Sequence, residues 1–179
     1  SDRLPFVETT GGNDAAPFAH GVTKRGLVAD AFGPRIRQPG AVAGVLLDFG
    51  VEVQGFVEII TPMMPDQSKP RRVRVRFGES ASEVMADIGG KQNAQNDHTV
   101  RDQTVVLPWL GKKSVGPSGF RFVRIDAVDP KLPVALSQVR AVLVLRDAPY
   151  VGSFRCDDER LNRIWQVGAY TVHLNMQEY

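Results

Sequence analysis

Within residues 71–77 (RRVRVRF), the side chains from Arg72 to Phe77 alternate strictly between polar and apolar. Successive side chains of a β-strand point to opposite faces of a sheet, whereas a helix repeats about every 3.6 residues. This run therefore predicts a strand with one buried face and excludes a helix at this point. We expect the polar face to be solvated or paired with acids on a neighbouring strand. The two faces consist of Val73, Val75 and Phe77 on the inside and Arg72, Arg74 and Arg76 on the outside.

Further β-like runs lie at residues 44–60, 104–107, 119–128 and 134–146. Stretches rich in glycine or proline separate them, and the first run is interrupted near Gly50 and Gly55. We find no helical period before residue 157. Several short strands separated by turns, without helices between them, are typical of an antiparallel all-β domain. We therefore predict a mainly β fold, an antiparallel jelly-roll-like β-sandwich followed by one C-terminal α-helix.

The C-terminal helix is predicted from an N-cap residue and from a stripe of apolar side chains at helical spacing. Asp157 or Asp158 supplies an oxygen acceptor for the unpaired N–H groups of a first turn. A short apolar strand containing Tyr150, Val151 and Phe154 is expected just before it. We find no stop signal and expect the helix to run to the chain end, as in a fragment cut from a larger protein. The apolar stripe that follows at helical spacing consists of Leu161, Ile164, Trp165, Gly168, Val172 and Tyr179.

The chain divides into three segments by composition. Residues 1–43 carry many glycines and prolines and are expected to form an extended lead-in with short strands at 3–7 and 35–38. Residues 44–148 contain the alternating runs and are expected to form the sandwich. Residues 149–179 are expected to form a connector and the helix.

Composition and charge exclude several classes of protein. Of the 179 residues, 42% are hydrophobic and 23% are charged, which is ordinary for a globular domain. A net charge of +2 is too small to indicate binding to nucleic acid. The single cysteine, Cys156, excludes an internal disulfide. We find no apolar run long enough to span a membrane, and we predict no cofactor.

Four segments in this order, LDFGVEVQGFVEI, VRVRFGES, GFRFVRID and VGSFRCDDERLNRIWQVGAYTVHLNMQEY, resemble the α-L-rhamnosidases of glycoside hydrolase family 78. The resemblance covers about residues 44–179. Its strongest part consists of Gly152, Phe154, Cys156, Asp158, Leu161, Asn162, Ile164 and Trp165.

The resemblance implies a β-sandwich that precedes an (α/α)6-barrel catalytic domain. It implies inverting hydrolysis of rhamnose-containing glycans by two carboxylates that lie on the barrel, beyond Tyr179. We therefore expect no catalytic residue in this chain, and we expect it to be inactive alone. The resemblance also implies that the helix contacts the barrel and that the protein is periplasmic or extracellular. The barrel-facing residues would be Leu161, Ile164, Trp165 and Val172.

Candidate carbohydrate-binding residues are Trp109, Asp97, His98 and Arg101. Trp109 could stack on a sugar ring, or it could close the end of the sandwich with its indole N–H bonded to a carbonyl. The other three lie in or beside a polar stretch at residues 79–99, a length that is often functional, although such a loop could simply be solvated. We find no histidines at metal-ligand spacing, and we expect no metal. The acids at 157–159 are interpreted as helix caps rather than as catalytic groups.

Three functions agree with this sequence. The first is the accessory sandwich and first catalytic-domain helix of an α-L-rhamnosidase. The second is a free-standing carbohydrate-binding module that uses Trp109 and the 79–99 loop. The third is a structural domain that orients other modules. A β-sandwich serves all three roles, so the fold alone does not choose among them.

Overall fold

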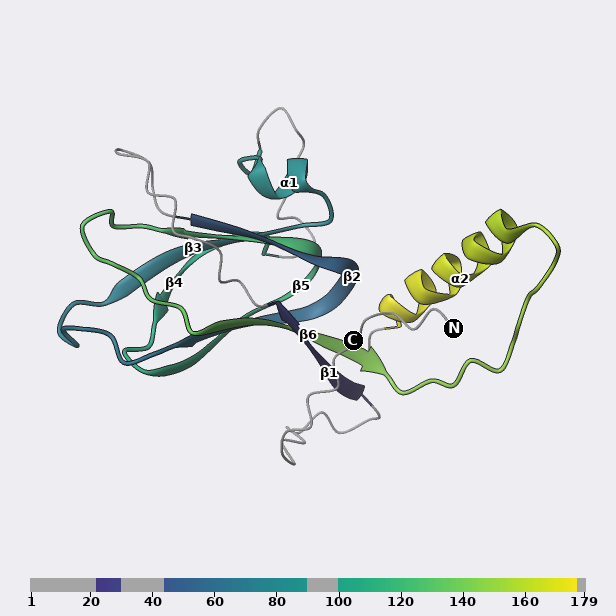
Figure 1. Ribbon diagram of the computed structural model, residues 1–179, viewed down its shortest axis with the longest axis horizontal. Coiled ribbons are helices and arrows are strands. Elements are labelled where there is room, and N and C mark those ends of the chain that lie inside the picture. Colours follow the sequence, from purple (N-terminus) through teal and green to yellow (C-terminus); the bar gives the residue numbers. More distant parts are fainter. Residues whose placement is uncertain (1–21, 30–43, 90–99, 177–179) are drawn as a thin grey trace.

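The computed structural model describes residues 22–29, 44–89 and 100–176 of the chain. In these residues six strands form one antiparallel sheet in the order β1-β6-β2-β5-β3-β4, accompanied by two helices (Figure 1). The predicted mainly β fold with a C-terminal helix is confirmed. In chain order the elements are β1 (Val22–Ala29), β2 (Gly44–Thr61), β3 (Arg71–Gly78), α1 (Ala81–Met85), β4 (Asp102–Leu107), β5 (Gly111–Ala127), β6 (Gln138–Arg146) and α2 (Glu159–Leu174).

The two layers of the sandwich belong to one continuous sheet, because β2 and β5 are long enough to take part in both. β2 has 18 residues and β5 has 17. The end of β2 pairs with the start of β5 and with β6, while its beginning pairs with the end of β5, which in turn pairs with β3. The sheet curves strongly between these two regions (Figure 1).

Two irregularities in β2 permit this curvature. The register with β5 shifts between Asp48 and Val53 and again between Gly55 and Val57. Gly50 has a φ of 78°, and Gly55 has a φ of 157°. A Cβ atom at Gly55 would lie 2.0 Å from the carbonyl oxygen of Val142, so only glycine fits this close approach. The predicted interruptions near Gly50 and Gly55 are therefore bulges within one strand.

The core lies between the two layers. The rings of Phe77 and Phe120 are 5.1 Å apart at its centre. The predicted inward face of β3 is confirmed, since Val73, Val75 and Phe77 are at most 2% exposed. Fully buried side chains come from β2, β3, β5 and β6, and they include Val53, Val57, Ile59, Val73, Val75, Phe77, Phe120, Val123, Val139 and Leu143.

Of the two alternatives for the polar face of β3, solvation or pairing with acids, solvation does not apply to Arg76. Its side chain is buried and donates from Nη2 to Asp126 Oδ2 on β5 at 2.9 Å. Arg74 is half-buried and bonds Asp102 on β4 and Asp87. Only Arg72 is fully exposed. The interpretation that acids on neighbouring strands pair with these arginines is the one that the structure supports.

Three local expectations were wrong, at the start of the 79–99 loop, at residues 150–154 and at the end of α2. The predicted polar loop at 79–99 begins with α1, whose N-cap is Ser80, and the structure places no strand at residues 150–154. β1 lies within the predicted lead-in, whereas the short strands expected at 3–7 and 35–38 lie outside the described residues. The helix α2 ends at Leu174 because Asn175 caps it, donating from Nδ2 to the Thr171 carbonyl at 2.8 Å.

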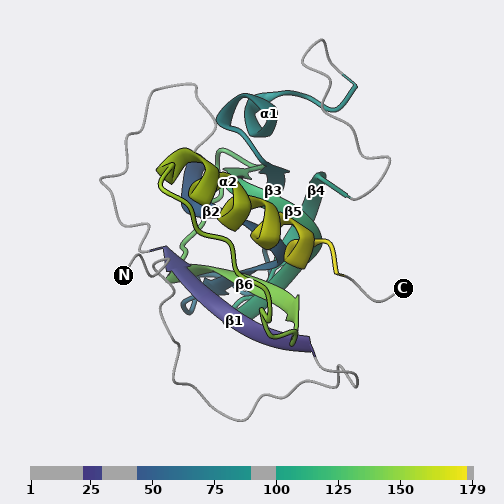
Figure 2. The same ribbon diagram turned by 90° about the vertical axis from the view of Figure 1, so that its right-hand side faces the viewer.

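Helix α2 lies at one end of the sandwich (Figures 1 and 2). Its N-cap is Asp158, as predicted, and the Asp158 carboxylate accepts from the N–H of Arg160 at 2.8 Å. Asn162 is buried and forms two 2.8 Å bonds with the backbone N–H and C=O of Cys156. The polar residues of the strongest resemblance motif therefore build the start of this helix. No helix in the described part of the chain is long and apolar enough to cross a membrane.

We predict that the Arg76–Asp126 pair is sensitive to removal of one partner. Asp126→Asn should lower the free energy of unfolding by about 3–5 kcal/mol, because it removes the buried counter-charge of Arg76 and leaves only a 3.9 Å contact with the exposed Asp87. The double variant Arg76→Met/Asp126→Leu should lose much less, since both buried charges are gone. Urea titrations followed by circular dichroism measure both.

The matched control is Arg121→Met, which removes an exposed pair with Asp48 and should change stability by less than about 1 kcal/mol. An Asp126→Asn variant that is as stable as this control would contradict the prediction.

Candidate functional site

Trp109 lies in the turn between β4 and β5. Its indole Nε1 donates to the carbonyl of Met64 at 2.7 Å, and the Met64 N–H donates to the Trp109 carbonyl at 3.0 Å. Thr61 adds a bond from its hydroxyl to the carbonyl of Pro108. The tryptophan therefore ties this turn to the loop after β2. The residue is 37% exposed, and sugar contact by Trp109 stays a prediction.

Arg101 lies just before β4, where its guanidinium is mostly buried. Its Nη1 contacts Glu83 Oε1 at 2.5 Å, and its Nη2 contacts Glu79 Oε1 at 3.2 Å. Arg101 and Trp109 flank opposite ends of β4, which separates them by about 20 Å at the usual rise per residue. The structure does not bring these two candidates together. The other two candidates, Asp97 and His98, lie outside the described residues.

A charged cluster that the sequence did not single out surrounds Glu52. This residue lies in the bulge of β2, where it is half-buried. Burial, with the neighbouring charge of Glu79, raises the pKa of the Glu52 carboxyl to about 7. Arg101 and Arg121 oppose this effect. Because alternation placed Glu52 on the solvent face of β2, sequence analysis gave no sign of its burial.

The Glu52 cluster also connects the sheet to α2. The hydroxyl of Tyr170 donates to the backbone carbonyl of Glu52 at 2.5 Å. Burial and the nearby Glu52 raise the pKa of the Tyr170 phenol to about 12, so this hydroxyl remains a donor at neutral pH. Within the described residues, no group of three or more His, Cys, Asp and Glu side chains could hold a metal ion.

The apolar stripe of α2 faces away from the sandwich. Tyr170 and Leu174 contact the sheet, with Leu174 only 7% exposed. The predicted stripe residues lie on the opposite side of the helix, because they are offset from Tyr170 by about half a turn at 100° per residue. Their exposed fractions are 47% for Leu161, 60% for Ile164, 36% for Trp165 and 64% for Val172.

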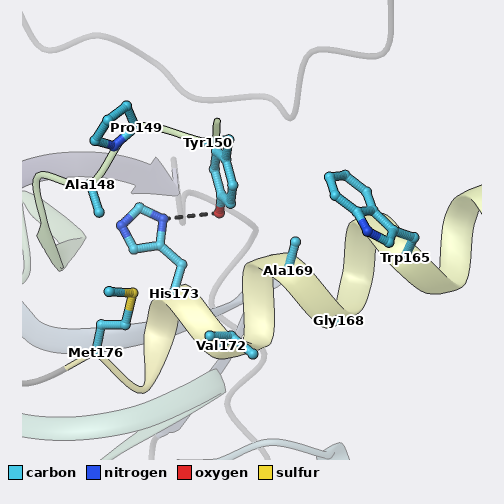
Figure 3. Close-up of a pocket in the computed structure, with 9 residues that line it drawn as sticks. All are labelled: Ala148, Pro149, Tyr150, Trp165, Gly168, Ala169, Val172, His173 and Met176. Carbon is cyan, nitrogen blue, oxygen red and sulfur yellow. Dashed lines mark hydrogen bonds between the residues drawn. The ribbon is translucent and has the colours of Figure 1, made fainter. Parts of the chain in front are cut away.

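A groove of about 440 Å³ lies between this helix and the connector that precedes it (Figure 3). Its walls are mostly apolar, with Pro149 and Tyr150 on one side and Trp165 and Met176 on the other. His173 lies between the walls and contacts the Tyr150 hydroxyl through Nδ1 at 2.9 Å. Tyr150 and His173 thus bond to each other, and the groove offers mainly apolar surface.

We predict that Glu52 makes the stability of this protein depend on pH. The pKa of its carboxyl is about 7 in the folded chain, against an ordinary value of 4.5. The folded state therefore holds the proton more tightly, and stability decreases as the pH rises from about 4.5 to about 7. Glu52→Gln carries no charge at any pH. It should raise the Tm at pH 8 by about 2–4 °C, which corresponds to a gain of ~1 kcal/mol in the free energy of unfolding at a partly solvated site. At pH 4 it should leave the Tm unchanged.

The control variant is Glu58→Gln on the same strand, which removes a 2.8 Å ion pair with Lys112 and should give no gain at pH 8. Differential scanning calorimetry at both pH values measures the effect. A Glu52→Gln chain that melts no higher than the parent at pH 8 would show that the carboxyl is adequately solvated.

No protein-family model and no curated protein matches this sequence. Among solved structures, the chain is similar to a rhamnosidase from Klebsiella oxytoca with rhamnose bound, at a TM-score of 0.64 and 20% identity, over 76% of this chain and 28% of that one. It is also similar to a GH78 family rhamnosidase of Bacillus sp. GL1, at a TM-score of 0.51 and 20% identity, over 82% of this chain and 14% of that one.

This chain spans less than a third of the length of either rhamnosidase. Identity at this level shows a shared fold, while activity depends on residues at a site. The resemblance to family 78 α-L-rhamnosidases that the sequence motifs predicted is thus confirmed in the fold: the described residues fold like one part of these enzymes.

Proposed function

We propose that this chain is a non-catalytic β-sandwich portion of a glycoside hydrolase that removes terminal α-L-rhamnose from glycans by an inverting mechanism. The observation that carries the proposal is the match of 76% of this chain to 28% of a rhamnosidase. The catalytic carboxylates would lie in the part of the longer protein that corresponds to the unmatched remainder. The proposed substrates are plant or bacterial glycans, so we place the protein in the periplasm or outside the cell.

The exposed face of α2 supports a partner within the same longer protein. This face runs along a 16-residue helix, about 24 Å in length, and is roughly 10 Å wide. A patch of that size is far below the roughly 800 Å² per partner that a stable complex of separate chains buries. A covalently connected partner is present at high effective concentration and needs less buried surface. The proposed partner is the (α/α)6 barrel, seated on Leu161, Ile164, Trp165 and Val172.

One observation favours a second candidate, a carbohydrate-binding module. Trp109 keeps 37% of its surface exposed in a turn, where an aromatic face is available for stacking on a sugar. Its indole N–H is already bonded to Met64, so recognition would depend on the ring face alone. Isothermal titration calorimetry with L-rhamnose measures this binding. If this candidate is correct, the binding should disappear in Trp109→Ala.

The first experiment compares the hydrolysis of p-nitrophenyl α-L-rhamnoside by this 179-residue chain and by the proposed longer protein that contains it. We expect turnover by the longer protein alone, because the paired carboxylates of an inverting hydrolase lie outside this chain. Turnover by the 179-residue chain would place the active site within it. An inactive longer protein would favour the binding-module or structural candidate.

A second prediction concerns the α2 face. Ile164→Glu and Val172→Glu should leave the Tm of the 179-residue chain unchanged, since both side chains are largely exposed there. In the longer protein each should lower the Tm by several degrees, because burying an unpaired carboxylate against an apolar partner is unfavourable.

The matched control is Val106→Glu on β4, which is 49% exposed and lies away from α2, and it should be neutral in both proteins. Equal Tm values for the Ile164→Glu and parent forms of the longer protein would show that nothing covers this face.

A further inference from the structure

Few contacts hold α2 against the sandwich. Among its side chains, only Asn162 and Leu174 are buried, and Asn162 bonds the connector rather than the sheet. Tyr170 adds its hydrogen bond to the Glu52 carbonyl. The N-terminal half of the helix is otherwise exposed. Apolar packing alone therefore does not determine where this helix lies.

A chain of hydrogen bonds through His173 supplies a further attachment. The Nε2 atom of His173 is 2.7 Å from the backbone carbonyl of Arg146, the last residue of β6. On the other side of the ring, Nδ1 is 2.9 Å from the Tyr150 hydroxyl in the connector. The rings of Tyr150 and His173 also meet edge to face, with centroids 5.3 Å apart (Figure 3).

The chemistry of the partners determines the direction of these bonds. A carbonyl oxygen can only accept, so His173 Nε2 must carry the hydrogen and donate to Arg146. In a neutral imidazole the other nitrogen then has a lone pair, and it accepts from the Tyr150 O–H. The chain thus runs from Tyr150 through His173 to β6, with every polar atom satisfied.

We propose that Tyr150, His173 and the Arg146 carbonyl form a clasp that fixes α2 and the connector to the end of β6 in one orientation. The clasp connects the end of β6 and the connector that follows it to α2, where His173 lies 23 residues beyond Tyr150 in the sequence. It lies at the end of the helix where the sheet contacts are. It also holds the connector and α2, between which the groove lies, at their present separation, because Tyr150 belongs to the connector and His173 to α2. This inference depends on contacts within the described chain and is independent of the proposed function.

Hydrogen–deuterium exchange of the 179-residue chain, followed by mass spectrometry, tests the clasp. His173→Phe keeps a ring for the edge-to-face contact and removes both hydrogen bonds. If each bond contributes about a fivefold factor, the backbone amides of α2 should exchange about 25-fold faster. Tyr150→Phe removes one bond, and His173→Gln keeps a donor for the Arg146 carbonyl. Both should show about fivefold faster exchange. Peptides from β2 and β5 should be unchanged in all three.

The control is Val167→Ala, an exposed position on the same helix that touches neither the clasp nor the groove, and it should not accelerate exchange. Nitrogen NMR of His173 at pH 8 gives an independent readout, for which we expect the tautomer with hydrogen on Nε2. Unchanged α2 exchange in Tyr150→Phe and His173→Phe, or the Nδ1–H tautomer, would overturn the proposal. Should His173→Phe unfold the sheet, the exposed Tyr150→Phe variant decides the question by itself.

Discussion

The pairing of β2 with β5 is the constraint on which the rest of the structure depends. Both strands are long enough to belong to each layer, so one bent sheet can bury its apolar face against itself. The bend requires the bulges at Gly50 and Gly55, and at Gly55 the neighbouring backbone leaves no room for a side chain. One bulge also exposes the Glu52 carbonyl to Tyr170, which gives α2 a place to attach. The same local irregularity therefore shapes the core and the junction with the helix.

Two regions of this sheet hold their charged groups in different ways. Where β3 meets β5, Arg76 and Asp126 are buried as a pair, and Arg124 donates to the same carboxylate at 2.9 Å. Near the bulge, in contrast, Glu52 is half-buried beside other acids, and the pKa of its carboxyl rises to about 7. In the first arrangement, nearby opposite charges stabilise the charged form of Asp126. In the second, burial destabilises the charged form of Glu52. The protein thus combines a charge pair that supports the fold with a carboxyl that responds to pH near neutrality.

Helix α2 has two distinct faces. One attaches to the sandwich through Tyr170, Leu174 and the His173 clasp, and the other presents apolar side chains to solvent. The proposed clasp and the exposed apolar face would together suit the proposed role of α2, which is to position a neighbouring domain. The fold shared with part of two rhamnosidases gives that neighbour its proposed identity. In the proposed arrangement the sandwich would be the fixed base, and the helix would set the direction in which the neighbour lies.

The sequence by itself determined most of the strands from β2 to β6, the inward face of β3 and the cap of α2, because side-chain alternation and capping are local properties. It also carried the family resemblance. Only the tertiary structure decided that Arg76 is buried, that Glu52 lies among other charges, and that His173 bonds both Tyr150 and Arg146. Each of these depends on residues that the fold brings together from different parts of the chain. Alternation predicts which side of a strand a residue occupies, but the burial of that side depends on what folds over it.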